Sequence, residues 1–209
     1  MVKKYRAVIY DVIPPGVKSD LKGVIEEKFK DYVIINEYYE SRLVVDKGSY
    51  RPALSDLLTD IWTKKVNVDA VIVKSLTKLG TLDMILFVKR VLEDRGVKLI
   101  SLNSKERILA ETPLAKLKRK LRYDDIRDYI MLAFTIGIGI YIIIHTLNPF
   151  FIGLIVATIG LLLFTYYRKT IKGRRNLGIM LDKVINLEIP YSTKMRFRIS
   201  VKGVEVLEE

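Results

Sequence analysis

Residues 129–167 read YIMLAFTIGIGIYIIIHTLNPFFIGLIVATIGLLLFTYY and contain no Asp, Glu, Lys or Arg. As a single helix, a segment of this length would extend roughly 58 Å, about twice the thickness of the hydrocarbon core of a bilayer. Its middle contains Asn148-Pro149, and the residue before a proline is biased away from helix. The segment therefore predicts two membrane-spanning helices, at about 130–147 and 150–167. A buried hairpin of a soluble helical protein is the alternative, and the length of the uncharged run argues against it.

Basic residues flank this segment on both sides. Six Lys or Arg residues lie within 116–127 and five within 168–175, whereas the turn at 145–149 has none. Because positively charged flanks stay in the cytoplasm, both ends of the predicted hairpin, and with them both termini, are expected on the cytoplasmic side of a cell membrane. His145 in the turn is interpreted as an interfacial residue. Gly153 and Ala157 form a small-x-x-x-small pattern that suits packing within the hairpin or between copies.

The composition of the 209-residue chain excludes several kinds of chemistry. Cysteine is absent, which excludes disulfides, thiolate nucleophiles and Cys-ligated metals, and no pattern indicates another metal or a cofactor. The formal net charge of +12 fits either anionic lipid or nucleic acid as a partner, and the predicted membrane flanks account for part of it. Glutamine is absent and lysine is frequent, a composition typical of thermophile proteins.

The first 103 residues alternate between strand-type and helix-type patterns. Apolar, β-branched runs typical of buried strands lie at 5–13, 32–38, 69–74 and 97–102. Between them, apolar residues at helical spacing follow Ser19, follow Pro52 and continue through 82–92. This alternation predicts an α/β domain with a mostly parallel sheet and flanking helices.

The loops of this domain resemble those of the serine recombinases, the resolvase/invertase family. The matching segments are RPAL at 51–54, KSLTKLGT at 74–81 and RGV at 95–97, in the same order as in the family. The resemblance covers roughly residues 4–103. It implies a resolvase-like sheet with flanking helices and a relationship to enzymes that cleave DNA.

The catalytic positions depart from the family pattern. The family attacks DNA phosphodiesters with a serine in a Tyr-x-Arg-Val-Ser segment, while arginines stabilise the phosphoryl transition state. The matching segment here is 10–14, YDVIP, in which Val12 replaces the arginine and Pro14 replaces the serine. Because proline has no hydroxyl group, no seryl-phosphate intermediate can form at this position. The resemblance therefore implies a pseudoenzyme.

The second motif is also altered. Thr77 stands where the family has an aspartate, and Lys78 and Thr81 stand where it has arginines. Lys78 keeps the positive charge but not the bidentate fork of a guanidinium group. Only Arg51 matches its catalytic position.

Eight basic residues are candidates for binding phosphate or lipid. They are Arg51, Lys74, Lys78, Lys116, Lys118, Arg119, Lys120 and Arg122. The last five fall in a predicted basic amphipathic helix that precedes the first span. Such a helix binds either DNA phosphates or anionic lipid headgroups, and its position next to the membrane favours headgroups.

The last residues form a small β unit. Apolar and polar residues alternate strictly over 195–201, which predicts a half-buried strand, and 204–207 supplies a partner strand. An apolar run at 184–189 predicts an earlier strand. The unit is too small to be stable alone, so it packs on the N-terminal domain, on another copy or on the membrane. The sequence is thus divided into four parts, namely 1–103, 104–128, 129–167 and 168–209.

These features predict a membrane-anchored, catalytically inactive recombinase-like domain that acts as a cytoplasmic binding or scaffolding module. One alternative is a membrane tether that binds DNA, and another is an active DNA recombinase with a relocated nucleophile at Ser19 or Ser75. A third is a subunit of a larger membrane complex. The expected partners are membrane lipid, DNA, or a second copy bound through the α/β domain or the spans. No pattern indicates a small-molecule substrate.

Overall fold

The computed structural model describes residues 4–17, 19–46, 50–145, 149–166, 172–190, 192, 195–200 and 203–208. The chain divides into two units. The first combines Met1–Leu114 with Val184–Glu209, and the second is Ala115–Lys183. Each unit is described by itself.

The first unit is built on a four-stranded sheet. Its strands are β1 (Tyr5–Ile13), β2 (Tyr32–Ser41), β3 (Ala70–Val73) and β4 (Lys98–Ser101). Their order is β2-β1-β3-β4, and every neighbouring pair is parallel. The predicted parallel sheet is confirmed. The four residues of β3 are fully buried, as expected of a central strand that is covered on both faces.

Helices cover both faces of this sheet. On one face α1 (Leu21–Lys28) packs against apolar side chains of β1 and β3. On the other face α3 (Pro52–Trp62) and α4 (Leu82–Asp94) enclose the larger core. The short helices of this unit are α2 (Arg42–Asp46), η1 (Leu76–Lys78), η2 (Ser104–Glu106) and α5 (Arg107–Glu111).

The C-terminal hairpin belongs to the same unit. Strands β5 (Met195–Ser200) and β6 (Gly203–Glu208) pair antiparallel, which confirms the strands predicted from the alternation. The apolar side chains of β5 are buried, and the Phe197 ring meets the rings of Trp62 and Phe87 edge-on with 5.9 Å between centroids. Of the three surfaces that the sequence left open for this β unit, the structure selects the N-terminal domain.

Hydrogen bonds between β5 and α3 fix this docking. The backbone N–H of Ile199 donates to Ser55 Oγ at 3.0 Å, and that of Phe197 donates to Thr59 Oγ1 at 3.1 Å. The N–H of Arg51 donates to the carbonyl of Ile199 at 2.8 Å. Ser55 and Thr59 lie one helical turn apart, so both hydroxyls face the same strand. Residues that follow the uncharged segment thus complete the core of the domain that precedes it, and Ala115–Lys183 is an insertion into that domain.

The strand predicted at 184–189 is wrong. Val184 lies near the end of helix α8 (Lys172–Ile185), and residues 187–190 are neither helix nor strand. The buried residues Leu181 and Val184 are three positions apart, so the apolar run continues the face of a helix. A short apolar run of this kind does not distinguish the end of a helix from a strand.

The second unit contains the uncharged segment. Helix α6 (Leu114–His145) is continuous for 32 residues and joins the predicted basic segment to the predicted first span. It is long and apolar enough to cross a membrane, and no second helix in the described part of the chain passes the same test. Helix α7 (Pro149–Tyr166) begins at the proline that the sequence identified as a break, while the turn residues 146–148 lie outside the described residues. The structure supports one span, and the second span stays a prediction.

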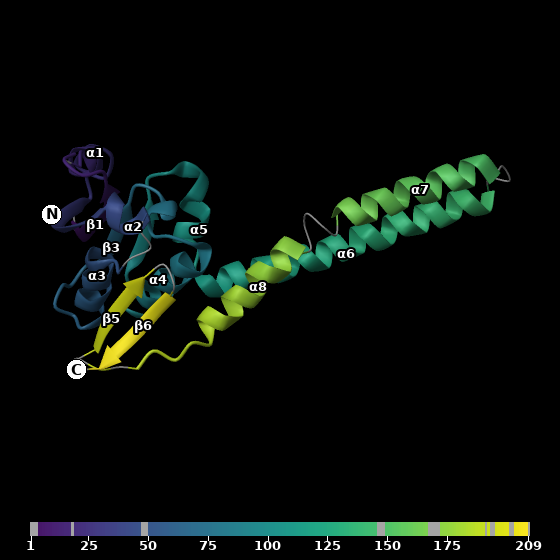
Figure 1. The fold of residues 1–209 in the computed structure, drawn as a ribbon. Coiled ribbons are helices and arrows are strands. Elements are labelled where there is room, and N and C mark those ends of the chain that lie inside the picture. The colour runs from purple at the N-terminus through teal and green to yellow at the C-terminus, as the bar shows by residue number, and fades with distance from the viewer. Residues whose placement is uncertain are drawn as a thin grey trace. The chain divides into compact units, whose positions relative to one another are not determined.

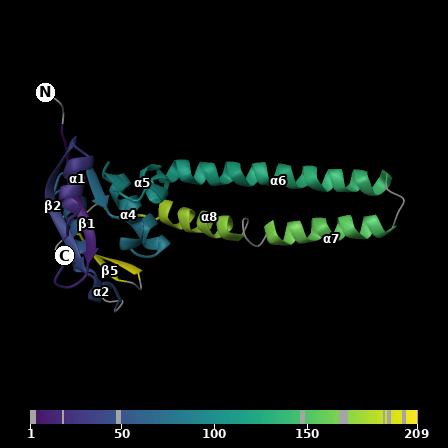
Figure 2. The same cartoon turned by 90° about the horizontal axis from the view of Figure 1, so that it is seen from above.

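Helix α6 has neighbours along its length in this unit. Two views show α7 beside its C-terminal part (Figure 1 and Figure 2). A methyl group at Gly139 would overlap the Ile159 side chain of α7, so the two helices approach closely at this point. Near the other end, ion pairs join Lys118 to Asp182 and join Arg174 to Asp128. The basic part of α6 is therefore paired antiparallel with α8.

Candidate functional site

The candidate site lies where the central strands of the sheet end. The chain leaves β1 toward α1 on one face, whereas the connection to β3 runs through α3 on the other face. In open parallel sheets, ligands bind in the crevice that such a switch creates outside the carboxyl ends of the strands. A pocket of about 620 Å³ lies there. Its lining comes from the end of β1, the beginning of α1 and the loops after β3 and β4. We call it the switch-point pocket.

Two of the predicted phosphate-binding residues line the switch-point pocket. Lys74 directly follows β3 and is exposed, and Lys78 is half-buried in η1. The Nζ of Lys78 donates to the carbonyl of Val12 at 3.0 Å. Val12 and Pro14, the positions that correspond to the arginine and serine of the family motif, line the same pocket. The fold thus brings four separately identified positions to one place.

Arg51, the residue that matches the family motif, is placed differently. Its side chain is 1% exposed and is not part of the pocket lining. Nη1 donates to the carbonyl of Leu79 at 2.5 Å, and Nη2 donates to the carbonyl of Lys78 at 2.6 Å and to Tyr10 Oη at 2.5 Å. The guanidinium group therefore holds the loop after β3 to β1 from within the core. As a phosphate ligand, Arg51 stays a prediction.

Two other buried groups near Arg51, Tyr10 and Glu40, have raised pKa values. Burial raises the pKa of Tyr10 far above its ordinary value, although the neighbouring Arg51 guanidinium acts in the opposite direction. Burial also raises the pKa of Glu40, against the lowering effect of the N–H groups at the beginning of α3 and of Arg51. The side chains of Arg51, Tyr10 and Glu40 do not line the switch-point pocket. They belong to the packed structure beneath it.

The remaining motif positions do not reach the pocket. Thr77 lies in η1 and is exposed, and Thr81 is exposed at the N-terminal cap of α4. Neither residue lines the switch-point pocket. The positions that correspond to the family's aspartate and second arginine are therefore surface positions beside the site.

Glu106 is a residue of this region that the sequence did not indicate. Its Oε1 accepts a hydrogen bond from Ser75 Oγ at 2.8 Å. Its Oε2 accepts from the N–H of Leu76 at 2.5 Å and from Ser101 Oγ at 3.1 Å. Burial acts to raise the pKa of Glu106, but these hydrogen bonds outweigh it, so the pKa is lowered overall. Thirty-one positions separate Glu106 from Ser75, so no local pattern reveals the pair.

The two serines considered as relocated nucleophiles are both engaged. Ser75 donates its single proton to Glu106 and accepts from Thr77. The lowered pKa makes Glu106 a weaker base than an ordinary glutamate. Ser19 lines the switch-point pocket, and its Oγ accepts a hydrogen bond from the N–H of Leu21 at 3.3 Å. Ser19 therefore acts at the beginning of α1, one residue before Asp20, which holds the N-terminal cap position.

The basic candidates of the second unit lie on α6. Lys116, Arg119, Lys120 and Arg122 are exposed, and among the described residues no acidic partner of theirs is found. Lys118 pairs with Asp182 of α8. The unpaired residues form a basic face on the part of α6 that precedes the uncharged run.

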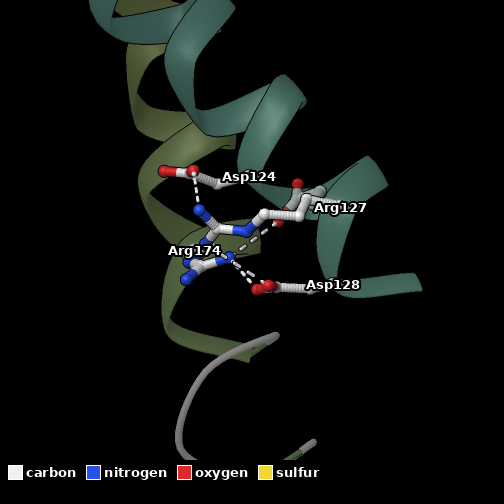
Figure 3. Close-up of polar contacts among 5 residues, drawn as sticks. Asp124, Arg127, Asp128 and Arg174 are labelled. Atoms are coloured by element: carbon white, nitrogen blue, oxygen red, sulfur yellow. Dashed lines mark hydrogen bonds and ion pairs between the residues drawn. The ribbon is translucent and has the colours of Figure 1, made fainter. Parts of the chain in front are cut away.

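A compact charge cluster follows this basic face (Figure 3). Arg127 lies 3.4 Å from Asp124 and 3.5 Å from Asp128, and Arg174 of α8 pairs with Asp128 and lies 3.9 Å from Asp125. Three carboxylates thus surround two guanidinium groups immediately before the uncharged segment. The cluster holds α8 against α6, and its three carboxylates balance the charges of Arg127 and Arg174.

The chain was compared with protein families, curated proteins and solved structures. No family model and no curated protein matches it. It is similar to the N-terminal catalytic domain of TP901-1 integrase, with 20% identity and a TM-score of 0.44, over 60% of this chain and 98% of that one. It is also similar to a resolvase family site-specific recombinase from Streptococcus pneumoniae, with 20% identity and a TM-score of 0.36, over 61% of this chain and 94% of that one.

Proposed function

We propose that this protein is a membrane-anchored, catalytically inactive recombinase-like domain that acts as a binding module in the cytoplasm. One observation carries the proposal. Pro14 lines the switch-point pocket at the position where the sequence motif places the nucleophilic serine. Covalent catalysis needs an activated nucleophile, and proline has no group that can attack phosphorus.

The arginines that stabilise the transition state in the recombinase motif are also replaced or bonded elsewhere. Val12 offers no charge for a phosphoryl transition state, and the guanidinium of Arg51 is bonded within the core. Stabilisation of that transition state requires donors that point at the reacting phosphoryl group. The pocket keeps lysines that bind an anion but lacks the groups that would cleave a phosphodiester.

The insertion of the second unit supports a two-span anchor. The core around Trp62 contains residues from before α6 and from after α8, in particular Phe197. One folded domain lies on one side of a membrane, so both ends of Ala115–Lys183 emerge on that side. The number of crossings is then even. With α6 as one span, α7 supplies the second, and the basic flanks favour the cytoplasmic side for the domain.

This topology is tested with single cysteines, because the natural chain contains none. We expect that a membrane-impermeant maleimide added to intact cells labels Thr146→Cys, in the turn between α6 and α7. It should not label Ser104→Cys, an exposed position of the first unit, until the cells are permeabilised. If both cysteines were labelled only after the cells were permeabilised, the two-span topology would be contradicted.

The loss of catalysis is tested with duplex DNA and the full-length protein in detergent. We expect that a denaturing gel shows no covalent protein–DNA adduct, because no activated hydroxyl faces the pocket. An adduct would overturn the proposal, and its loss in Ser19→Ala or in Ser75→Ala would then identify the nucleophile.

A DNA-binding membrane tether is the second candidate, and the continuity of α6 favours it. At 1.5 Å per residue, Arg122 lies about 10 Å and Lys116 about 20 Å along the helix from the start of the uncharged run. A headgroup layer is only about 5–8 Å thick, so most of the basic face stands beyond it. The test is duplex DNA binding by the full-length protein in detergent across a salt series. An affinity that falls steeply as salt rises supports this candidate, and no binding at low salt excludes it.

A further inference from the structure

We propose that the switch-point pocket binds a free nucleoside monophosphate. The proposal rests on the inactive-domain function above, because a site without a nucleophile is left with binding alone. The pocket volume of about 620 Å³ falls within the range of roughly 300–1,000 Å³ that is typical of small-molecule sites. Three kinds of side chain line it, and each matches one part of such a ligand.

The lysines match the phosphate group. Each ammonium group carries three N–H donors, and Lys78 uses one of them on the carbonyl of Val12. Lys74 has no hydrogen-bond or ion-pair partner among the described residues. The pair therefore presents about five donors and two positive charges, which suits a phosphate with three terminal oxygens better than the two oxygens of a carboxylate.

Asp20 matches the sugar. It is exposed at the N-terminal cap of α1, lines the pocket, and makes no capping hydrogen bond with its side chain. An ionised carboxylate only accepts hydrogen bonds, and the two hydroxyl groups of a ribose can donate to it. An acidic residue in this role is common at nucleotide sites of parallel sheets. Asp11, the other acidic residue of the lining, is 5% exposed, and its Oδ1 accepts from the N–H of Val12.

Apolar side chains match the base. Val17, Leu21 and Val24 line the pocket from the loop before α1 and from its first turn. Leu21 is buried, so this wall is part of the packed structure, whereas Val17 is half exposed. Burial of one face of a flat ring against such a wall is favourable because it removes apolar surface from water. Together, the three surfaces correspond to phosphate, ribose and base.

The test is calorimetric titration of the full-length protein in detergent micelles with adenosine monophosphate. We expect saturable binding at 1:1 stoichiometry. Adenosine alone and inorganic phosphate alone should each bind at least about tenfold more weakly, because each lacks one set of contacts. Lys74→Gln should weaken binding of the monophosphate about tenfold, because it removes a charged hydrogen-bond donor to the phosphate. Lys65→Gln, an exposed lysine outside the pocket, should leave the affinity unchanged.

Each contrary outcome has a distinct meaning. The inference is overturned if the protein does not bind adenosine monophosphate at millimolar concentration. It is also overturned if Lys74→Gln and the unaltered protein bind adenosine monophosphate with equal affinity. Equal affinity for inorganic phosphate and the nucleotide overturns the assignment of the sugar and base surfaces. Thermal unfolding of each variant, followed through the fluorescence of Trp62, verifies that the domain is folded. If the nucleotide does not bind, the proposal of an inactive binding domain still stands. A covalent DNA adduct would contradict that proposal, whether or not the nucleotide binds.

Discussion

Replacement of Arg51 by methionine is expected to lower the free energy of unfolding of the first unit by roughly 3–5 kcal/mol. Methionine fills the space of the alkyl chain but makes none of the three hydrogen bonds to Leu79, Lys78 and Tyr10. Two carbonyls and one phenol then lose their donor in an environment where Arg51 is 1% exposed. The measurement is urea unfolding in detergent, followed by fluorescence of Trp62, the only tryptophan of the chain.

The matched control is Arg107→Met. Arg107 is exposed, and among the described residues it pairs with Glu111 alone, so its replacement should change stability by less than about 0.5 kcal/mol. The comparison separates two roles of Arg51. If Arg51→Met unfolds like the unaltered protein but loses affinity for adenosine monophosphate, the arginine is a ligand of the pocket, and its structural role as described is wrong.

Truncation of Phe197 to alanine should also cost roughly 3–5 kcal/mol. The ring is completely buried and lies edge-on to Trp62 and to Phe87, so its removal leaves a cavity between α3 and α4. The same unfolding experiment measures the change. Since Phe197 follows the uncharged segment in the chain and Trp62 precedes it, a large effect on Trp62 fluorescence links both flanks of the insertion to one folded domain.

Arg198→Ala is the control for this substitution. Arg198 is the next residue of β5, points to the opposite side and is exposed, so its loss should be nearly neutral. Equal stability of Phe197→Ala and Arg198→Ala would show that the hairpin does not complete the core. In that case Ala115–Lys183 would not be an insertion into one folded domain, and an odd number of membrane crossings would be possible.

Much of the fold was predictable because its signals are local. Continuous apolar runs mark β1 and β3 since both are buried on both faces, and strict alternation marks β5 because only one face is buried. The wrong prediction of a strand at 184–189 shows where local apolar patterns are insufficient. Val184 belongs to the buried face of α8, and that face can be recognised only when the helix before it is known.

The candidate site was predictable in part. Val12, Pro14, Lys74 and Lys78 were identified from the resemblance of their segments to recombinase motifs, and the parallel pairing of β1 and β3 brings these segments together. Glu106 was missed because its partner Ser75 lies 31 positions away, and Asp20 was missed because only the folded chain places it at the pocket. Arg51 was identified from its motif, but the motif does not show that its guanidinium N–H groups donate hydrogen bonds within the core.

The amino-acid sequence by itself determined that this protein has an α/β domain with parallel strands and an uncharged segment long enough for membrane crossing. These properties depend on periodicity and on the absence of charge over short stretches, and both can be read locally. Only the tertiary structure decided that the last strands complete the first domain, so that the uncharged segment lies within an insertion. That result depends on contacts such as Phe197 with Thr59, 138 positions apart, which packing selects and no local pattern encodes.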